Sequence, residues 1–348
     1  MGKFKLRNST ILGDYDKPYI VAEVNTSHFG NLETAKKMIT KAKKAGCDCV
    51  KFQSWSAETL YSKTYYDENP IEKRFVEKFS FSDEELTEVA EYSKNSEIAF
   101  ASTPYSRAEV DFLLEKCNVP YIKVASMDLN NCPFLEYIAR SGAPIVLSTG
   151  MGELEEIHRA VETIENAGNK NICLLHCVSI YPPEVSTIRL RNISGLRKEF
   201  PDYPIGFSDH SIGTEIPSAA VALGACMIEK HFTLDRTKIG MDNHMAMEPE
   251  EMAQLVTHCH NVQVALGESE RIVLQAEMEQ RNLMRRSIVS TKDLKAGKKL
   301  IKSDLDVKRP GTGIPPNKLN DLIGRTLIRN VERDTLITEK DISGKQQI

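Results

Sequence analysis

Eight short apolar runs recur between residues 18 and 232, and amphipathic segments separate most of them. The segments 32–46 and 153–168 repeat apolar residues every three or four positions and end in glycine, which is typical of helices and their C-terminal caps. A strand followed by a helix, repeated eight times, predicts an α/β fold whose parallel strands close into a (β/α)8 TIM barrel. The predicted strands cover 18–24, 47–53, 98–103, 121–126, 144–149, 172–177, 204–209 and 227–232.

Each of these runs ends in polar or ionisable side chains. In a barrel of this kind the carboxyl ends of the strands meet at one mouth. Burying so many polar groups costs free energy unless they face one another, water or a ligand, so we expect a composite active site there. The strand-end residues are Glu23, Lys51, Gln53, Ser102, Thr103, Lys123, Ser126, Ser148, Thr149, His176, Ser208, His210, Glu229 and His231.

Charge and composition narrow the class of function. The net charge of −4 provides no global field that would attract nucleic acid or an anionic membrane surface. No apolar run approaches the roughly 18 residues needed to span a bilayer. The eight cysteines form no C-x-x-C pair, so we expect reduced thiols rather than a disulfide framework or a cysteine metal site. These features favour a cytoplasmic protein with no nucleic acid or membrane partner.

Two segments depart from the repeating pattern. Residues 54–95, between the second and third predicted strands, are longer than one helix requires, and their aromatic first part is a candidate substrate loop or lid. Residues 287–348 contain 13 Lys and Arg but only eight Asp and Glu, so this segment is basic. Turns rich in glycine and proline separate its short strand-like runs. We therefore expect a barrel domain over 1–284, a connector over 275–286 and a small separate domain over 287–348.

Four groups of residues, most of them at or near the strand ends and one, Arg309, in the C-terminal segment, indicate particular chemistries. His210 and His231 follow neighbouring strands and could hold one divalent metal while leaving positions open for substrate oxygens, although a pair of core histidines fits the pattern equally well. The cations Lys51, Lys123 and Arg309 suit a small polyanion. The carboxylates Glu23 and Asp128 are the best placed for proton transfer, and the serines and threonines could either donate to a ligand or cap their own strands.

In this order, several motifs resemble the sialic acid synthase family, and the resemblance runs nearly end to end. The matching stretches are A-E-V-N-T-S-H-F-G, V-K-F-Q, S-T-P-Y-S, K-V-A-S-M-D-L-N-N, L-S-T-G-M, H-C-V-S-I-Y-P, G-F-S-D-H-S, A-L-G-A, E-K-H-F-T and V-K-R-P-G-T-G. The resemblance implies a TIM barrel followed by a C-terminal antifreeze-like (β-clip, SAF) domain. It also implies a homodimer in which that domain is swapped onto the partner's barrel.

The family's activity is the condensation of phosphoenolpyruvate with an N-acylated hexose, which yields a nonulosonic acid and phosphate. The resemblance implies a C–C bond-forming transferase that uses Mn²⁺ or Mg²⁺ and cleaves the C–O bond of phosphoenolpyruvate. Carried over by motif, the metal ligands are His210 and His231, and the phosphoenolpyruvate-binding residues are Lys51, Thr103, Lys123, Ser126, Ser148, Ser179 and Ser208. The sugar-binding residues are Gln53, Asp128, Tyr181, Asp242 and Arg309, and the catalytic residues are Glu23, Lys51 and Asp128.

Two departures from the family pattern both concern the sugar side. Ser27 precedes His28 where the family often has Asn, and Asp128 stands where many bacterial members have Glu. The acceptor is therefore open: N-acetylmannosamine or a relative, or a 2,4-diacetamido hexose, as in a legionaminic or pseudaminic acid synthase. Two more distant alternatives are a Schiff-base aldolase that uses Lys51 or Lys123, and a non-catalytic sugar-binding protein.

Overall fold

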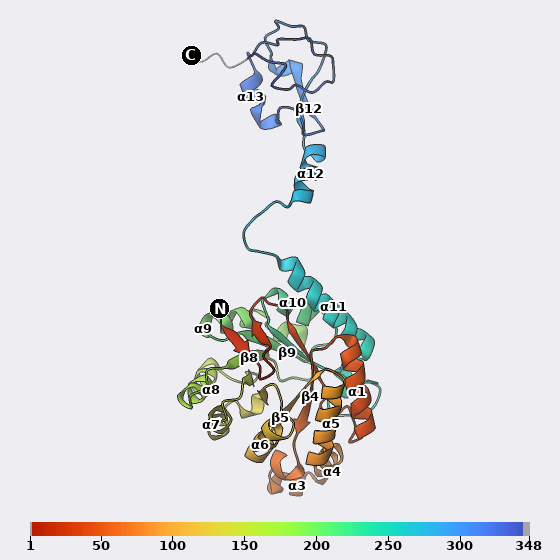
Figure 1. Cartoon of the computed structure of the whole chain (residues 1–348), viewed down its shortest axis with the longest axis vertical. Helices are drawn as coiled ribbons and strands as arrows, with labels where there is room; N and C mark the ends of the chain where they lie inside the picture. Colours follow the sequence, from red (N-terminus) through yellow and green to blue (C-terminus); the bar gives the residue numbers. More distant parts are fainter. Residues whose placement is uncertain (1, 344–348) are drawn as a thin grey trace. The chain divides into compact units, whose positions relative to one another are not determined.

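The first unit of the chain is built on eight parallel strands. The computed structural model describes residues 2–343 and divides into two units, Met1–Gly267 and Glu268–Ile348 (Figure 1). The ladder order β5-β4-β3-β10-β9-β8-β7-β6 is that of a barrel opened between β5 and β6, which confirms the predicted (β/α)8 arrangement. The strands are β3 (Tyr19–Glu23), β4 (Cys49–Ser54), β5 (Ala99–Pro104), β6 (Ile122–Val124), β7 (Ile145–Ser148), β8 (Ile172–Cys177), β9 (Ile205–Asp209) and β10 (Met227–His231).

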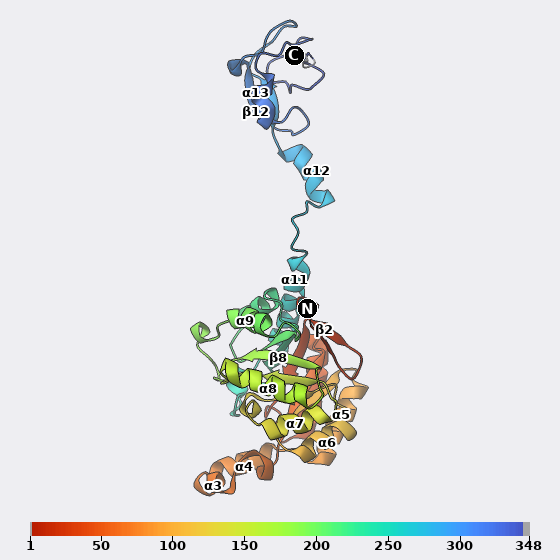
Figure 2. The same cartoon turned by 90° about the vertical axis from the view of Figure 1, so that its left-hand side faces the viewer.

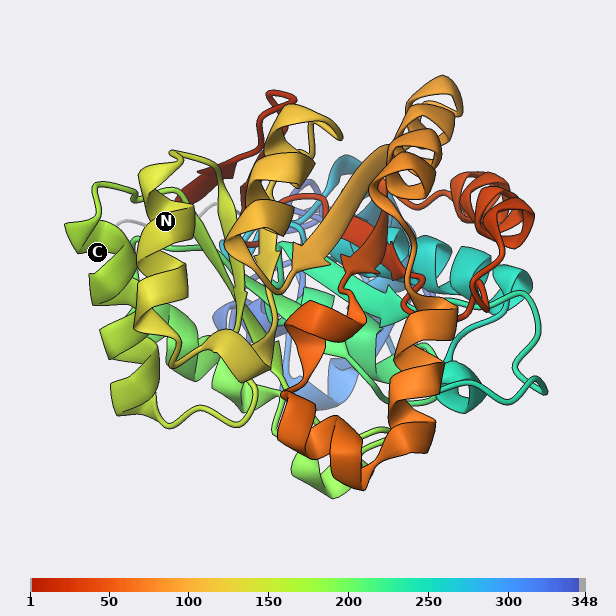
Figure 3. The ribbon, with the colours of Figure 1, turned by 90° about the horizontal axis from the view of Figure 1, so that it is seen from below.

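Helices cover the outer face of this sheet. Figure 3 shows them ringing the strands. The first of them begins at the cap residue Asn31, whose side chain accepts from the Thr34 amide, and ends at Gly46 in the left-handed conformation (φ 91°). The surrounding helices are α1 (Leu32–Ala45), α5 (Asp83–Asn95), α6 (Arg107–Glu115), α7 (Cys132–Arg140), α8 (Leu154–Asn166), α9 (Arg191–Glu199), α10 (Glu215–Ala222) and α11 (Pro249–Leu266).

Successive strand residues point to opposite faces of the sheet, so each strand contributes to two cores. In β3, Ile20 and Ala22 pack in the cluster shared with the helices, whereas Tyr19 and Val21 pack in the cluster inside the barrel. Glu23 is the next residue on the inner face. The alternation therefore brings its carboxylate to the inside of the barrel at the carboxyl end of the strand.

An N-terminal hairpin closes the opposite end of the barrel. Its strands β1 (Lys3–Lys5) and β2 (Ile11–Gly13) pair antiparallel, and Phe4, Leu6 and Leu12 join the inner cluster. This hairpin was not predicted from the sequence, because its two three-residue strands lie before the repeat of strand and helix. Its buried side chains replace the water that would otherwise meet the lower part of the inner core.

We expect this hairpin to contribute measurably to stability. Leu12→Ala should lower the free energy of unfolding by about 2–5 kcal/mol, because Leu12 is only 3% exposed in the inner core. Ile11→Ala, on the adjacent and 57% exposed residue, should change it by no more than about 0.5 kcal/mol. Urea unfolding followed by circular dichroism measures both variants, and equal losses would show that the hairpin does not seal the barrel.

The long segment after β4 folds into three short helices rather than a loop. They are α2 (Ala57–Leu60), α3 (Lys63–Glu68) and α4 (Pro70–Phe79), and Figure 2 shows α3 and α4 extending beyond the ring of helices. Trp55, Tyr66 and Val76 form a small core of their own, against which Tyr61 and Tyr105 pack. This core attaches the segment to the side of the barrel mouth from which Tyr105 projects.

The second unit has its own small core. Its elements are α12 (Gln275–Met284), β11 (Ser287–Ser290), β12 (Leu305–Lys308) and α13 (Leu319–Leu322). The helix α12 occupies most of the predicted connector, and the last five residues of the predicted domain lie outside the described part of the chain. The core residues are Ile288, Leu294, Leu300, Leu305, Ile314, Leu322, Leu327, Val331, Ile337 and Ile342. Among residues 2–343, no helix is both long and apolar enough to cross a membrane.

Candidate active site

A cavity of about 240 Å³ opens at the carboxyl ends of the barrel strands. It brings together most of the residues selected from the sequence. Those that line it are Glu23, Lys51, Gln53, Thr103, Lys123, Ser126, Ser148, Ser179, Tyr181, Ser208, His210, His231 and Asp242. They come from all eight strands or from the loops that follow them, as expected for a composite site in a barrel mouth.

Two buried lysines and two buried carboxylates form the floor of this cavity. Lys51 makes an ion pair with Glu23, and its Nζ lies 3.8 Å from Glu229 Oε2. Lys123 Nζ lies 3.8 Å from the other oxygen of the same carboxylate, Glu229 Oε1. No side chain of the four is more than 7% exposed. Glu229 therefore holds two ammonium groups facing the cavity, and such a pair of fixed point charges suits a phosphate or carboxylate.

The carboxylates of this floor differ in how readily they ionise. Burial raises the pKa of Glu23 to about 7, although the positive charge of Lys51 opposes the shift. Burial would also raise the pKa of Glu229, but Lys123 and Lys51 outweigh it and hold that pKa below its usual value. Glu229 is thus a permanent anion at neutral pH, whereas Glu23 is poised to bind or release a proton.

Three hydroxyl groups of the cavity accept hydrogen bonds from neighbouring groups. Lys51 Nζ donates to Thr103 Oγ1 at 3.1 Å, Lys123 Nζ donates to Ser148 Oγ at 2.7 Å, and the Gly150 amide donates to Ser126 Oγ at 3.1 Å. In each contact the hydroxyl oxygen is the acceptor. Its proton therefore stays available to donate to an anion in the cavity.

The two predicted metal ligands lie side by side at the rim. The ring centroids of His210 and His231 are 5.4 Å apart. His210 Nδ1 lies 2.8 Å from the Val178 carbonyl oxygen, so Nδ1–H donates and Nε2 is the atom left to bind a metal once it loses its proton. Burial would lower the pKa of His210, but interactions led by a hydrogen bond with Cys177 outweigh it and raise that pKa. Burial and the charge of His210 hold the pKa of His231 well below its usual value, which keeps that ring neutral.

These features fit a divalent metal whose remaining positions are filled by substrate oxygens or water. Neutral imidazoles are metal ligands, and two of them leave an open coordination sphere. Among residues 2–343, no group of three or more His, Cys, Asp and Glu side chains is arranged to hold a metal. The protein would therefore supply only part of the coordination sphere at this site.

A chain of hydrogen bonds links the acidic residue Glu23 to the side of the cavity. Tyr105 OH donates to Gln53 Oε1 at 3.1 Å, and Gln53 Nε2 lies 3.4 Å from Glu23 Oε1. On the other side, Asn25 Nδ2 donates to Asp242 Oδ2 at 2.5 Å. These amide and carboxyl groups could fix hydroxyl groups of a polar ligand above the charged floor.

Five residues that line the cavity were not selected from the sequence: Tyr105, Ala125, Met127, Met151 and Cys177. Tyr105 lies two residues beyond Thr103 and therefore shares a face with it. Period-two alternation, applied consistently along each strand, would have found Tyr105. Glu229, expected at the mouth as a strand-end residue, does line the cavity.

The same alternation corrects three of the strand-end residues. Ser102 Oγ lies 2.6 Å from Ser54 Oγ, Thr149 Oγ1 donates to the Leu175 carbonyl at 3.0 Å, and His176 Nε2 lies 2.7 Å from the Ile188 carbonyl. None of the three lines the cavity. The prediction that they belong to the mouth was wrong, because each alternates with a neighbour that faces inward.

Two of the predicted sugar-binding residues lie outside the cavity lining. Asp128 follows β6 in a short 3-10 turn and accepts from Asn131 Nδ2 at 2.9 Å, and burial raises its pKa. Arg309 belongs to the second unit, where it is exposed directly after β12.

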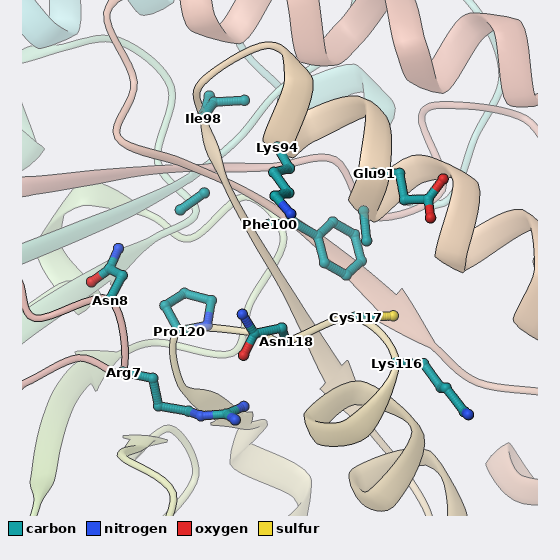
Figure 4. Close-up of a pocket in the computed structure, with 12 residues that line it drawn as sticks. Arg7, Asn8, Glu91, Lys94, Ile98, Phe100, Lys116, Cys117, Asn118 and Pro120 are labelled. Carbon is teal, nitrogen blue, oxygen red and sulfur yellow. The ribbon is translucent and has the colours of Figure 1, made fainter.

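A second cavity, of about 370 Å³, lies at the amino-terminal ends of the strands and contains Arg7, Lys94 and Lys116 (Figure 4). Each of these cations has a local structural role. Arg7 Nη1 donates to the Leu114 and Val119 carbonyls, and Lys94 and Lys116 lie at helix C-termini, where positive charge is favourable. The mouth cavity, with its buried charges, is therefore the stronger candidate for catalysis.

Comparison with known families gives two matches along the chain. Residues 38–271 match the NeuB family, and residues 285–343 match the SAF domain. The second match confirms the expected antifreeze-like domain at the C-terminus.

Relatives cover nearly the whole chain. An N,N'-diacetyllegionaminic acid synthase of Legionella pneumophila is 35% identical over 332 residues, covering 92% of this chain and 93% of the relative. An N-acetylneuraminate-9-phosphate synthase of Homo sapiens is 36% identical over 344 residues, covering 94% of each chain. The crystal structure of an N-acetylneuraminic acid (sialic acid) synthetase from Leptospira borgpetersenii superposes with a TM-score of 0.73 at 35% identity, covering 80% of this chain and 94% of that one.

Proposed function

Because the chain belongs to the NeuB family, as its motifs predicted, we propose that it condenses phosphoenolpyruvate with an N-acylated hexose to give a nonulosonic acid and phosphate. One observation supports this reaction more than any other. Lys51 and Lys123 come from different strands, yet both contact Glu229 on the floor of one cavity. Phosphoenolpyruvate carries a carboxylate and a phosphate close together, and two fixed ammonium groups complement such a dianion.

In this proposal phosphoenolpyruvate lies on the charged floor. Lys123 and Lys51 neutralise its anionic groups, and the hydroxyl groups that accept from these lysines donate to its oxygens. The remaining serines at the strand ends extend this shell. The binding residues are Lys51, Thr103, Lys123, Ser126, Ser148, Ser179 and Ser208.

His210 and His231 hold a divalent metal, Mn²⁺ or Mg²⁺, at the rim. When bound, it supplies Lewis-acid polarisation of the aldehyde of the open-chain acceptor sugar. The aldehyde end of the sugar lies over the cavity. Gln53, Tyr181 and Asp242 contact the hydroxyl groups of the sugar.

The reaction forms a C–C bond and a C–O bond from water, and it breaks the C–O bond to phosphate. C3 of phosphoenolpyruvate attacks the aldehyde carbon, whose oxygen takes the electron pair of the C=O bond and a proton to become a hydroxyl group, and a water molecule adds at C2. Glu23 orients this water and accepts its proton, for which a carboxylate with a pKa of about 7 is well matched at neutral pH. The tetrahedral product then releases inorganic phosphate by cleavage of the C2–O bond, which leaves the 2-keto acid.

The acceptor is N-acetylmannosamine or a close relative, and a 2,4-diacetamido hexose is the alternative. Relatives of both kinds match the chain to similar extents. We propose that the protein is a homodimer in which Arg309 of the C-terminal domain contacts the sugar bound in the partner's barrel. Asp128, half-buried after β6, completes the sugar side.

Phosphate release with a panel of acceptors tests the reaction and its sugar together. The enzyme is incubated with phosphoenolpyruvate, Mn²⁺ and either N-acetylmannosamine, its 6-phosphate or a 2,4-diacetamido hexose. We expect stoichiometric phosphate with one of these acceptors and only background release without an acceptor. If no acceptor in the panel yields phosphate from the folded protein, the proposed reaction is wrong as stated.

Removal of the metal should abolish turnover. With a chelator present, the rate of phosphate release should fall at least about 100-fold, since Lewis-acid polarisation is worth several kcal/mol. Addition of excess Mn²⁺ should restore it. Full activity after exhaustive chelation would contradict the metal site at His210 and His231 but would leave the phosphoenolpyruvate site standing.

One observation favours the Schiff-base alternative, because burial lowers the pKa of Lys123 and so favours a neutral, nucleophilic amine. Three contacts oppose it: Lys123 Nζ donates to Ser148 Oγ and to the Val124 carbonyl and faces the Glu229 carboxylate. This environment supplies acceptors for an ammonium group. An aldolase of that kind would also release no phosphate in the acceptor panel.

A further inference from the structure

A buried ion pair stands directly behind the two histidines of the rim. Asp209 precedes His210 at the end of β9, and Lys230 precedes His231 at the end of β10. The strand register places Asp209 opposite Lys230, and their side chains are each 1% exposed. Lys230 Nζ lies 2.6 Å from Asp209 Oδ2, so the pair joins the two strands immediately before the histidines leave them.

The same two side chains also fix the backbone after His210. The Ser211 amide donates to Asp209 Oδ1 at 2.9 Å, and the Ser211 hydroxyl donates to Asp209 Oδ2 at 2.9 Å. Lys230 Nζ donates to the Ser211 carbonyl. His210 therefore lies between two residues that are held to each other and to the residue before His231.

The alternation of strand side chains separates this cluster from the cavity. Asp209 and Lys230 point to the outer face of the sheet, whereas Ser208 and Glu229 line the mouth. Substrate in the cavity would therefore not touch the ion pair. Any influence of the ion pair on the chemistry would act through the neighbouring histidines.

Stability alone does not explain why charges occupy this place. A buried ion pair is often replaceable by apolar side chains of similar volume without loss of stability, because desolvation offsets the attraction. Geometry is a stronger reason, since a lysine bridging a carboxylate and a backbone carbonyl fixes both strand ends. Groups that hydrogen-bond to metal ligands commonly orient them, and here the ion pair would act one step further out, through the backbone on either side of His210 and before His231.

We propose that Asp209, Lys230 and Ser211 form a clamp that sets the separation and orientation of the His210 and His231 rings, so that Asp209 and Lys230 are positioning residues of the metal site. This inference rests on the metal assigned to those histidines under the proposed function. It predicts that the clamp controls metal affinity in the absence of any substrate.

Mn²⁺ binding to the full-length protein, measured by electron paramagnetic resonance of the free ion, tests the clamp directly. Asp209→Asn keeps the acceptor for the Ser211 amide but removes the charge that holds Lys230. We expect its Mn²⁺ affinity to fall about 10- to 100-fold. Asp209→Asn/Lys230→Met removes both charges, and we expect its urea midpoint to recover towards wild type while its Mn²⁺ affinity stays low.

The chain offers a matched control at the other end of β9. Asp14 pairs with Arg197 and accepts from the Ile205 amide at 3.0 Å, so it is a second buried ion pair that holds the same strand. Asp14→Asn/Arg197→Met should leave the Mn²⁺ affinity unchanged. If the Asp209 variants bind Mn²⁺ as tightly as wild type, the clamp is overturned and the proposed reaction is untouched. If wild type itself binds no Mn²⁺, both the clamp and the metal assignment are wrong.

Discussion

Glu23→Gln is expected to lower kcat by about 10²- to 10⁴-fold, because removal of a general base in contact with the reacting water has an effect of that size. The amide keeps the shape of the side chain but cannot accept a proton. In this variant Lys51 still has one carboxylate partner, Glu229, whose Oε2 lies 3.8 Å from Lys51 Nζ. The floor of the cavity therefore keeps an anion beside Lys51. Initial rates of phosphate release at saturating phosphoenolpyruvate and acceptor measure the change.

Two comparisons make this result specific. Glu33→Gln, on a side chain that is 72% exposed at the start of α1, should leave kcat unchanged. Circular dichroism should show that the Glu23 variant is folded. If Glu23→Gln retains more than about a tenth of the wild-type kcat, another group moves the proton, and Glu23 is only a partner of Lys51.

Lys123→Met should reduce kcat/KM for phosphoenolpyruvate by about 100-fold or more, since loss of one partner of a buried charge pair costs about 2–5 kcal/mol. The effect has two sources. The substrate loses a fixed ammonium group, and Glu229 loses one of the two cations that keep it ionised. Initial rates at varied phosphoenolpyruvate give the loss, and most of it should lie in KM.

The second cavity provides the control for charge. Lys94→Met removes an exposed lysine at the amino-terminal end of the barrel and should leave kcat/KM within about twofold of wild type, as expected for a surface substitution away from the reacting groups. If Lys123→Met leaves the KM for phosphoenolpyruvate unchanged, this substrate does not bind at the charged floor of the mouth cavity. A comparable loss in Lys94→Met would point to the second cavity instead.

The barrel was predictable from sequence because its strands lie in apolar runs that alternate with helical segments, and even the three-residue β6 lies in such a run. The predicted 172–177 and the observed Ile172–Cys177 coincide, and the other strands differ by a few residues at their ends. The hairpin of β1 and β2 was missed because its two three-residue strands lie before the repeat of strand and helix begins. The helices α2 and α3 have only four and six residues, and the segment that contains them and the ten-residue α4 was predicted to be longer than one helix, with a candidate loop or lid in its first part.

Much of the site was also predictable, because polar residues at the ends of buried strands need partners. However, whether a residue lines the cavity depends on its position along the strand, and polarity alone does not decide it. His176 is polar and is the last but one residue of β8, but its ring faces outward to the Ile188 carbonyl, whereas Cys177, the last residue, lines the cavity. Glu229, another of the strand-end residues, lies on the inner face and pairs with both lysines.

The fate of the bridging oxygen of phosphoenolpyruvate tests the proposed reaction most directly. Phosphoenolpyruvate that carries ¹⁸O between C2 and phosphorus is turned over with the best acceptor of the panel, and both products are analysed by mass spectrometry. We expect a nine-carbon keto acid without label and inorganic phosphate that contains the ¹⁸O, as C–O cleavage requires. Label retained in the keto acid, or phosphate released without any nine-carbon acid, would contradict the proposed chemistry at this barrel mouth.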